Sequence, residues 1–490
     1  MEQKLTHLRT DLPELHHWRV ITDGEIERIR EGALRLLQKA GFRILSRPIL
    51  ERLEQRGFQV DYPSGTVRPT PRQMAQVEET ALRNAPPIND EPLLRRALPA
   101  GESVGHNFTC YYDAREGIRR AATLQDIRNV VKAWHMLPEI AQTGPCMTAQ
   151  DVPYSIEPIA STVEALKLTD KIHHCPELML AEQLPYLEEL ETLLNDRPVR
   201  YHVNGCSVNH FTMDERACRC LLAVARNGLE GWWINSTPVA GASAPVSLAG
   251  ATLVGVAETL GGWLAGWALN EGVRLSAIPL AGIMDMRTTR SLFSTPETIL
   301  IDCALYQFFY RLYGIQIGLC AGYTDATVPG MQAVNDKLLK SLAYGLFVDF
   351  LGGQTGTLSA GNIYSPTQQM LDLEINRQAA QLAHGFEINS ETLALNEIEQ
   401  YASDERASFL MMDHTTHNFR QALWRPQFLN RLAFESAAEE RRNDLATVER
   451  AEARWREALA RYSPPELDEA KIKAAEGVLA HARQTLLLNG

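Results

Sequence analysis

The stretch from Gly314 to Gln332, GIQIGLCAGYTDATVPGMQ, decides the fold that this chain is expected to adopt. Its first half is an apolar, β-branched run that stops at small residues, as a buried strand does. A loop with Tyr323, Thr324 and Asp325 follows, and a helical pattern begins after Pro329-Gly330. In parallel barrels the reactive groups lie at such carboxyl ends of strands. The stretch therefore predicts a strand, a functional loop and a helix.

The same alternation of strand and helix recurs between residues 119 and 430 at a spacing of about 30 to 40 residues. Its apolar runs are continuous, which is typical of parallel strands covered on both faces. Seven runs and a plausible eighth favour an α/β fold, a (βα)8 TIM-type barrel, over an open doubly wound sheet. No GxGxxG follows the first run, which argues against a dinucleotide-binding sheet. The predicted strands are 143–148, 173–180, 200–208, 231–241, 273–282, 314–322 and 344–353.

Two regions flank this barrel. Residues 1–118 read as an N-terminal α+β cap, and residues 431–490 as a C-terminal helical extension broken by Ser463-Pro464-Pro465. Mixed charge on the extension is typical of solvated helix faces. The predicted cap helices are 24–40, 48–57 and 71–84, the cap strands are 42–45 and 103–113 with a hairpin at 58–67, and the C-terminal helices are 431–461 and 466–487.

The composition of the 490 residues excludes several partners. Net charge is −12, from 48 basic and 60 acidic residues, and no basic run stands out, so no nucleic acid is expected. The N-terminus has no apolar signal segment, and the longest apolar passage, Ala249–Leu269, contains Glu258 and indicates a buried helix. We therefore expect no membrane span. The eight cysteines fit a reduced, cytoplasmic protein, and Cys218-Arg219-Cys220 lacks a second ligand pair, so no metal site is predicted.

Polar side chains gather after the predicted strands, and three enzyme classes can be tested against them. A Schiff-base aldolase needs a lysine at a strand end, but Lys337 and Lys340 fall in a helical pattern. A zinc hydrolase needs converging ligands, and a serine hydrolase needs a GxSxG elbow that Gly241-Ala242-Ser243-Ala244-Pro245 only half resembles. None of the three is favoured. The collected residues are Gln150, Asp151, Asn204, Ser207, Asn209, His210, Asn235, Ser236, Thr237, Asp285, Arg287, Tyr323, Thr324, Asp325, Gln354, Thr355, Asp413, His414, Thr415, Thr416, His417 and Arg420.

Aromatic side chains lie near the same strand ends. An aromatic face beside a carboxylate attracts a quaternary ammonium group. Trp232 and Trp233 point to opposite faces of one strand, so at most one of them faces the interior, and core packing is the competing interpretation for both. The small residues near the mouth serve either tight turns or the approach of a bulky cofactor. The aromatic residues are Trp232, Trp233, Phe293, Tyr323 and Tyr364.

Residues 25 to 431 resemble the trimethylamine methyltransferase family of corrinoid-dependent enzymes. The motifs that carry this resemblance are ALRLLQKAGFRILSRPILERLEQRGFQVDYPSGTVRPTP, GPCMTAQDVP, PVAGASAPVSLAGATLVGVAETLGGWLA, MDMRTTRSLFSTPE, GYTDATVPGMQA and HTTHNFRQALWRPQFLNR. The resemblance implies a TIM barrel that moves a methyl group from an N-methyl amine to the cobalt of a separate corrinoid protein. The implied cofactor is thus cobalamin, carried by that partner, with no metal bound by this chain and with a homo-oligomer as the expected assembly.

The chain departs from the archaeal trimethylamine enzymes at two places. It contains no pyrrolysine, which by resemblance points to the branch whose substrates are quaternary amines such as glycine betaine. Many relatives carry Tyr-Glu-Lys after the seventh strand, where this chain reads Ser365-Pro366-Thr367-Gln368-Gln369. The alternatives are a barrel that binds amines without turnover, a trimethylamine enzyme, and a barrel lyase or isomerase of unrelated substrate.

The resemblance assigns roles as hypotheses. Tyr323 would form an aromatic wall for the methylammonium group, and Asp325 would supply negative charge or orient its neighbours. Arg287 would pair with a substrate carboxylate, although an ion pair with Asp285 that fixes the loop is an equal alternative. For His417 and Arg420, helix capping and packing is the favoured interpretation. The full predicted site is Tyr323 and Asp325 as catalytic residues, with Trp232, Arg287, Gln332, His414 and Tyr364 as substrate-binding residues.

Overall fold

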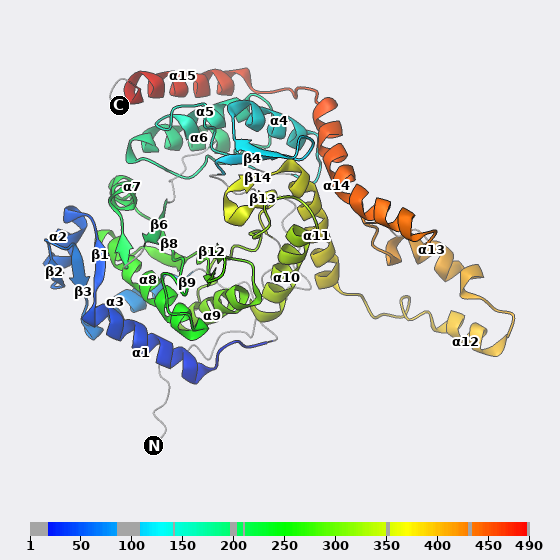
Figure 1. Ribbon diagram of the computed structural model, residues 1–490, viewed down its shortest axis with the longest axis horizontal. Coiled ribbons are helices and arrows are strands. Elements are labelled where there is room, and N and C mark those ends of the chain that lie inside the picture. Colours follow the sequence, from blue (N-terminus) through cyan, green and yellow to red (C-terminus); the bar gives the residue numbers. More distant parts are fainter. Residues whose placement is uncertain are drawn as a thin grey trace.

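The computed structural model describes residues 18–85, 108–140, 143–196, 203–208, 211–348, 353–429 and 434–487. These residues form a mixed α/β protein with fifteen α-helices (Figure 1). The helices are α1 (Asp23–Lys39), α2 (Arg47–Gln55), α3 (Pro71–Arg83), α4 (Leu124–His135), α5 (Glu157–Leu166), α6 (Leu184–Asn195), α7 (Glu215–Arg226), α8 (Leu248–Leu269), α9 (Pro296–Tyr313), α10 (Met331–Val348), α11 (Pro366–His384), α12 (Leu395–Ser403), α13 (Asp413–Ala422), α14 (Ala437–Ala460) and α15 (Glu469–Leu486).

The strands are short and belong to three sheets, ordered β10-β8-β6-β7-β1-β3-β2, β12-β11-β9 and β13-β14-β4-β5. They are β1 (Phe42–Ile44), β2 (Gln59–Asp61), β3 (Thr66–Arg68), β4 (Cys110–Asp113), β5 (Ile118–Ala121), β6 (Val203–Val208), β7 (Thr212–Met213), β8 (Gly231–Asn235), β9 (Val239–Ala240), β10 (Arg274–Ala277), β11 (Gly282–Asp285), β12 (Arg290–Leu292), β13 (Thr357–Leu358) and β14 (Ile363–Tyr364). Three 3-10 turns are η2 (Ala181–Gln183), η3 (Ser359–Gly361) and η4 (Phe409–Met411).

The N-terminal elements confirm the predicted helices, the strand at 42–45 and the hairpin. Thr22 and Glu25 form a capping box that starts α1, and Thr70 and Gln73 form another at α3, where Pro71 is the first helical residue. In the hairpin β2 and β3 pair antiparallel, and β3 pairs with β1. Because β1 also pairs in parallel with β7, the N-terminal elements extend the sheet that contains β6, β8 and β10.

Eight consecutive helices, α4 to α11, form a ring in which each helix packs on the next (Figure 1). The ring closes where the Trp134 indole on α4 donates a 2.7 Å hydrogen bond to Gln369 Oε1 on α11. Inside the ring, β6, β8 and β10 are neighbouring parallel strands, and β14 pairs in parallel with β4.

The expected closed barrel of strands is not seen among the described residues. The predicted runs at 143–148 and 173–180 make only single bridges, Thr143 with Ile172 and Met147 with Phe108. The run at 344–353 is wrong as a strand, because α10 extends to Val348 and residues 349–352 lie outside the described part. A short apolar run fits a buried helix as well as a strand, and here the helix prevails.

The segment that opened the sequence analysis lies between two helices. Gly314 adopts a left-handed conformation (φ 70°) that ends α9, and its N–H donates to Tyr310 O at 2.8 Å. Residues 315–320 then run extended without forming a described strand, held at one point by the hydrogen bond from Gly318 N to Ala277 O at 3.0 Å. The predicted helix after Gly330 is confirmed as α10.

Helix α8 is sandwiched between the N-terminal helices and the sheet, and it is apolar on almost all sides. It packs on α1, α2 and α3 and also on β6, β8 and β10. Three glycines let it approach closely: Gly261 faces the ring of Phe42, Gly262 faces Ile234, and Gly266 faces Trp232. Of the described helices, α8 alone has the length and hydropathy of a membrane span, and 78% of its apolar window is buried inside the protein. Its composition is thus explained by burial, as predicted for Ala249–Leu269.

The C-terminal helices pack on the outside of the ring. Helix α14 lies on α4 and α11, and α15 lies on α5 and α6. Both bury a narrow stripe, and the Trp455 indole on α14 donates to Glu452 Oε2 at 2.6 Å. Between α11 and α14 the chain leaves the body and forms α12 and α13 at the right of Figure 1.

Candidate functional site

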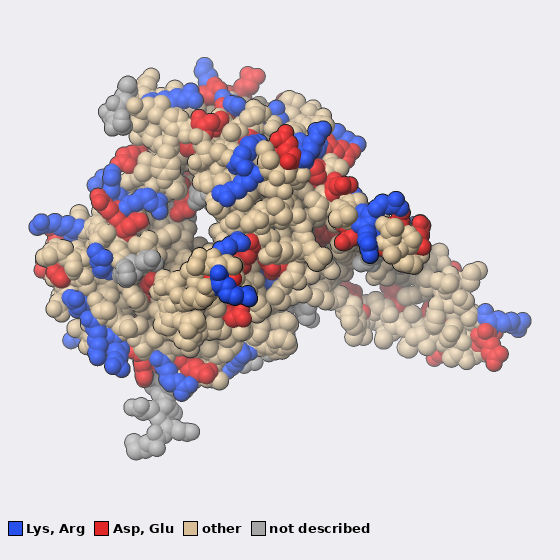
Figure 2. Space-filling model, in the orientation of Figure 1, with Lys and Arg blue, Asp and Glu red and all other residues tan. Residues whose placement is uncertain are grey.

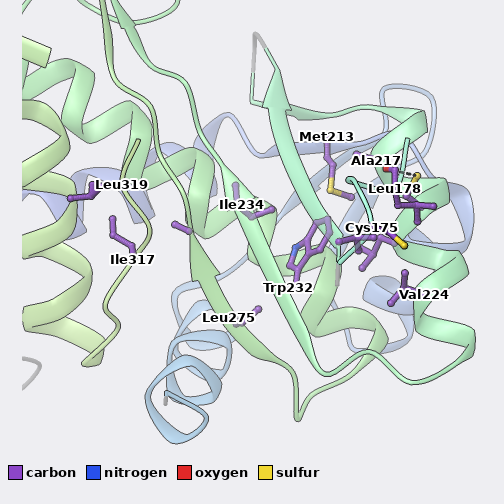
Figure 3. Close-up of a cluster of buried hydrophobic side chains, with 14 of the residues drawn as sticks. Cys175, Leu178, Met213, Ala217, Val224, Trp232, Ile234, Leu275, Ile317 and Leu319 are labelled. Carbon is purple, nitrogen blue, oxygen red and sulfur yellow. Dashed lines mark hydrogen bonds between the residues drawn. The ribbon is translucent and has the colours of Figure 1, made fainter. Parts of the chain in front are cut away.

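The alternation of side chains along β6 and β8 separates the core from the interior of the ring. Trp232 and Ile234 point towards α8, whereas Trp233 and Asn235 point the other way. Trp232 is fully buried, and its Nε1 donates to Gly262 O at 2.9 Å. Figure 3 shows it within a cluster of buried side chains from neighbouring elements. The structure therefore places the predicted substrate-binding residue Trp232 in the core.

The opposite faces of the same strands carry small polar groups. Asn235 pairs in register with Cys206, and its Nδ2 lies 3.9 Å from Cys206 Sγ. The amide oxygen of Asn235 is buried and has no hydrogen-bond partner in the described structure. Burial raises the pKa of Cys206, and the Glu177 carboxylate raises it further. This face can therefore still accept a hydrogen-bond donor.

Tyr323 lies close to these groups although it comes from a distant loop. Burial raises the pKa of Tyr323 well above its ordinary value, with smaller contributions from Cys320, Glu177 and Cys206. Its ring lies so close to Gly361 that a Cβ there would be 2.5 Å from Cε1. Since Gly361 also has a φ of 88°, any other residue would displace the ring.

Glu177 is the residue that sequence reasoning missed. It lies in the predicted strand 173–180 and acts on the pKa of Tyr323, Cys206 and Tyr154. Arg216 opposes its effect on Cys206 and Tyr154, so both charges lie near these two side chains. The sequence did contain a signal for it, since Glu177 is an acidic residue in a run that was expected to be buried on both faces. Asn209 and His210, which follow β6, lie outside the described residues.

Asp325 fixes the backbone of the neighbouring loop. Its carboxylate accepts hydrogen bonds from Phe293 N at 2.8 Å and from Ser294 N at 2.9 Å. Ser294 Oγ in turn donates to Tyr323 O at 3.0 Å. Thr324 Oγ1 donates to Asp336 Oδ2 at 2.7 Å, which ties the loop to α10. The structure thus brings Tyr323 and Asp325 together, with Asp325 holding the loop that carries the ring.

A buried network of charges lies behind this loop. Lys337 forms an ion pair with Asp372, and Asp372 also accepts from Gly356 N at 2.8 Å. Lys340 Nζ donates to Cys320 O at 3.3 Å, and burial lowers the pKa of both lysines. Both lysines lie on α10, as the sequence predicted.

Close to Lys340, the buried Asp302 accepts hydrogen bonds from the Tyr344 hydroxyl at 2.7 Å and from Ala281 N at 2.9 Å. Burial raises the pKa of Asp302 to about 6. Asp302 and the two lysines of α10 thus lie between the helices and the segment 315–320.

The other predicted residues lie elsewhere. Gln332 is exposed in the first turn of α10, and Arg287 is exposed beside Asp285, with Nε 3.6 Å from Oδ1. Tyr364 is fully buried, and its hydroxyl donates to Gln369 Oε1 at 2.7 Å. His414 lies on α13, outside the ring of helices (Figure 1). Of these four, only Gln332 continues the segment that carries Tyr323.

The loops that follow the strands also expose large apolar side chains. Met286 and Val246 lie together beside Gly241, where a Cβ would be 2.7 Å from Met286 Cε and 3.7 Å from Val246 Cγ2. Scattered exposed apolar residues are ordinary, whereas contiguous ones indicate an interaction surface. We call the exposed large apolar residues of these loops the apolar rim: Tyr154, Val208, Val246, Met286, Val328 and Met331. Within the described ranges no three His, Cys, Asp or Glu residues gather as a metal site would require.

Comparisons with known proteins agree over nearly the whole chain. The family described as trimethylamine methyltransferase matches residues 2–485. A glycine betaine methyltransferase of Desulfitobacterium hafniense (strain Y51) is 25% identical over 478 residues, 94% of this chain and 97% of the relative. A trimethylamine methyltransferase of D. hafniense (strain DSM 10664 / DCB-2) is 23% identical over 81% of each chain, and one of Methanosarcina barkeri (strain Fusaro / DSM 804) is 24% identical over 69% of each. This chain belongs to the trimethylamine methyltransferase family.

Proposed function

We propose that this protein transfers a methyl group from a quaternary, betaine-like amine to the cobalt of a corrinoid carried by a partner protein. The observation that carries the proposal is the Tyr323 ring held against Gly361 in surroundings where Glu177 and Cys206 both contribute to raising the pKa of Tyr323. An aromatic face next to a carboxylate attracts a methylated ammonium group, which has no N–H to donate. The relative named for glycine betaine supports this substrate class, and the relatives named for trimethylamine support N-methylated amines more broadly.

The reaction requires no proton transfer to the leaving group. A quaternary nitrogen departs as a neutral tertiary amine, so no side chain has to protonate the leaving group. The chain has to hold the methyl carbon in line and exclude water. Tyr323 would form the wall against the ammonium group, and Asp325 would act by fixing the 293–294 turn beside that wall. When the partner is bound, its reduced cobalt supplies the nucleophile.

The carboxylate end of a betaine requires a cation or an amide. Arg216 is one candidate, because its charge lowers the pKa of Cys206 and of Tyr154. We retain Gln332 and Arg287 as groups that could reach this end from the mouth, since both are exposed. The buried positions of Trp232 and Tyr364 support roles in holding the strands, and the distance of α13 from the ring in Figure 1 leaves His414 without support in this chain's own site.

The mouth of the proposed site suits a bulky, flat partner group. The segment Gly241-Ala242-Ser243-Ala244 offers small side chains, and Met286 and Val246 of the apolar rim lie exposed beside Gly241. Such a surface favours a protein partner over a freely diffusing ion. We propose the apolar rim as the docking surface of the corrinoid protein.

The closed ring of helices α4–α11 supports a TIM-type barrel as the underlying fold. On that basis we propose the cap at residues 1–118, the barrel at 119–430 and the helical extension at 431–490. The free thiols and the burial of α8 fit a cytoplasmic protein. A homo-oligomer completes the proposal.

Methyl transfer can be measured directly with cob(I)alamin and a panel of quaternary amines, by the appearance of methylcobalamin. We expect transfer from at least one betaine. Tyr323→Ala and Glu177→Gln should each lower kcat/KM by about tenfold to a hundredfold, whereas Tyr323→Phe, which keeps the ring, should change it far less. No transfer from any quaternary amine would overturn the proposal. Tight betaine binding in calorimetry without transfer would favour a non-catalytic amine-binding protein.

A further inference from the structure

A long segment between α11 and α14 projects from the body with its apolar side chains exposed. We call residues 385–429 the arm. Figure 1 shows it leaving the ring on the right. On the face visible in Figure 2, most of the arm is uncharged, and charged side chains lie at its tip. Its exposed large apolar residues are Phe386, Ile388, Leu393, Leu395, Ile398, Tyr401, Phe409, Leu410, Met411, Phe419, Leu423 and Leu429.

The exposed apolar area of the arm is large enough for a stable interface. Four aromatic side chains, with exposed fractions from 41% to 86%, leave about 400 Å² exposed at roughly 200 Å² per side chain. Eight aliphatic side chains of similar exposure add at least as much. A standard interface buries about 800 Å² on each partner, whereas the largest apolar patch of a monomer is about 300–600 Å².

Helix α12 has one apolar face that is exposed. Leu395, Ile398 and Tyr401 recur at helical spacing on one face, and all three are at least 48% exposed. Tyr401 stacks on Phe409, with ring centroids 4.4 Å apart, so this apolar face continues into η4. A helix of nine residues gains most of its stability from packing such a face.

The body carries an apolar groove that could receive this helix. It lies between α1, α8 and α9, has a volume of about 550 Å³, and is lined by Ile21, Ile29, Leu253 and Leu300 among others. Helices α1 and α8 lie at the left of Figure 1 and α12 at its far right, so the groove is not filled by the arm of the same chain. The chain thus carries both a projecting apolar helix and an apolar groove.

We propose that the arm packs on a second copy of this chain, with Leu395, Ile398 and Tyr401 of α12 seated in the groove between α1, α8 and α9. A second copy fits better than the corrinoid protein, because a carrier that must dissociate in each cycle uses a smaller and more polar interface, whereas permanent interfaces are the most apolar. An arm-to-groove contact joins unlike surfaces, so it generates a reciprocal pair or a closed ring where the geometry closes, and an open filament where it does not.

Sedimentation of single-site variants tests this directly. We expect the purified wild-type chain to be an oligomer at micromolar concentration and Ile398→Glu to be monomeric there. Gln400→Glu places the same charge on the opposite face of α12, and this control should leave the oligomer intact. A wild-type monomer, or an Ile398→Glu protein of unchanged mass, would overturn the proposal.

A mixing experiment tests the groove. Leu300→Glu should also dissociate the oligomer, because it places a charge in the groove while leaving the arm unaltered. Since Ile398→Glu keeps a working groove and Leu300→Glu keeps a working arm, an equimolar mixture should form a one-to-one dimer. If the two variants stay monomeric when mixed, although each keeps the wild-type circular dichroism melt, the groove is not the receptor. These readouts are masses, so they stand or fall independently of methyl transfer.

Discussion

Two sides of the helix ring hold their inner segments in different ways. On one side β6, β8 and β10 form regular parallel ladders, and α8 covers them with an apolar surface of glycine and tryptophan contacts. On the other side, the run 315–320 has no described ladder, and the helices α9, α10 and α11 that cover it contribute buried charges.

The difference follows from where backbone groups find partners. Buried N–H and C=O groups must be hydrogen-bonded, and a ladder satisfies them on the first side. On the second side, side chains do so: Lys340 donates to Cys320 O, Asp302 accepts from Ala281 N, and Asp372 accepts from Gly356 N. The loop with Tyr323 belongs to this second side. Its position therefore depends on buried ionic groups and not on strand pairing.

Removing one member of the buried pair should have the largest effect. Lys337→Met leaves the Asp372 carboxylate buried without its cation, and this should lower the free energy of unfolding by about 3–5 kcal/mol. Chemical denaturation with urea measures the loss. The half-buried Lys471, which pairs with the exposed Asp196, is the control, since Lys471→Met should cost less than about 1 kcal/mol. Equal losses in both variants would show that the second side does not depend on its buried charges.

The sequence predicted the first side better than the second. Continuous apolar runs identified β6, β8 and β10, and glycines with Glu258 identified α8 as buried. On the second side, Lys337 and Lys340 were placed correctly in a helix, but their burial against Asp372 and Asp302 depends on long-range packing that local periodicity does not contain. Tyr323 was found because it follows an apolar run. Glu177 was missed because the prediction treated residues 173–180 as core.

Glu258 is buried on α8, the helix that covers the first side. Its titration should have the next largest effect on stability. Burial raises its pKa from 4.5 to about 7, with Ser207 as its only opposing partner. The native state thus retains a proton that the unfolded chain loses above pH 4.5. Stability is full below pH 4.5 and is lost as the pH rises to 7. Over this range the loss is about 3 kcal/mol, at 1.4 kcal/mol per pH unit.

Glu258→Gln removes this titration, so its stability relative to the wild type should increase by about 3 kcal/mol between pH 4.5 and pH 7.5. Urea unfolding at four pH values measures the difference. Glu449→Gln, at an exposed position on α14, is the control for the substitution itself. A flat profile for Glu258→Gln would mean that the carboxyl group is not desolvated under α8.

The close approach of α8 to β8 offers the smallest and cleanest test. A Cβ on Gly266 would lie 2.5 Å from Trp232 Cδ1, so Gly266→Ala must displace the indole or the helix. Overpacking of this kind costs about 1–3 kcal/mol, and the gain in helix propensity from glycine to alanine returns about 1 kcal/mol. We expect a net loss of up to about 2 kcal/mol in the free energy of unfolding.

Gly477 is the matched control for this substitution. It lies within α15, and a Cβ there meets no atom within 4 Å, so Gly477→Ala should stabilise the protein by about 0.5–1 kcal/mol through helix propensity alone. The difference between the two variants isolates the contact with Trp232. If both variants stabilise the protein equally, α8 does not depend on its glycines for its fit to β8. If only Gly266→Ala destabilises, close packing holds the first side as buried charge holds the second.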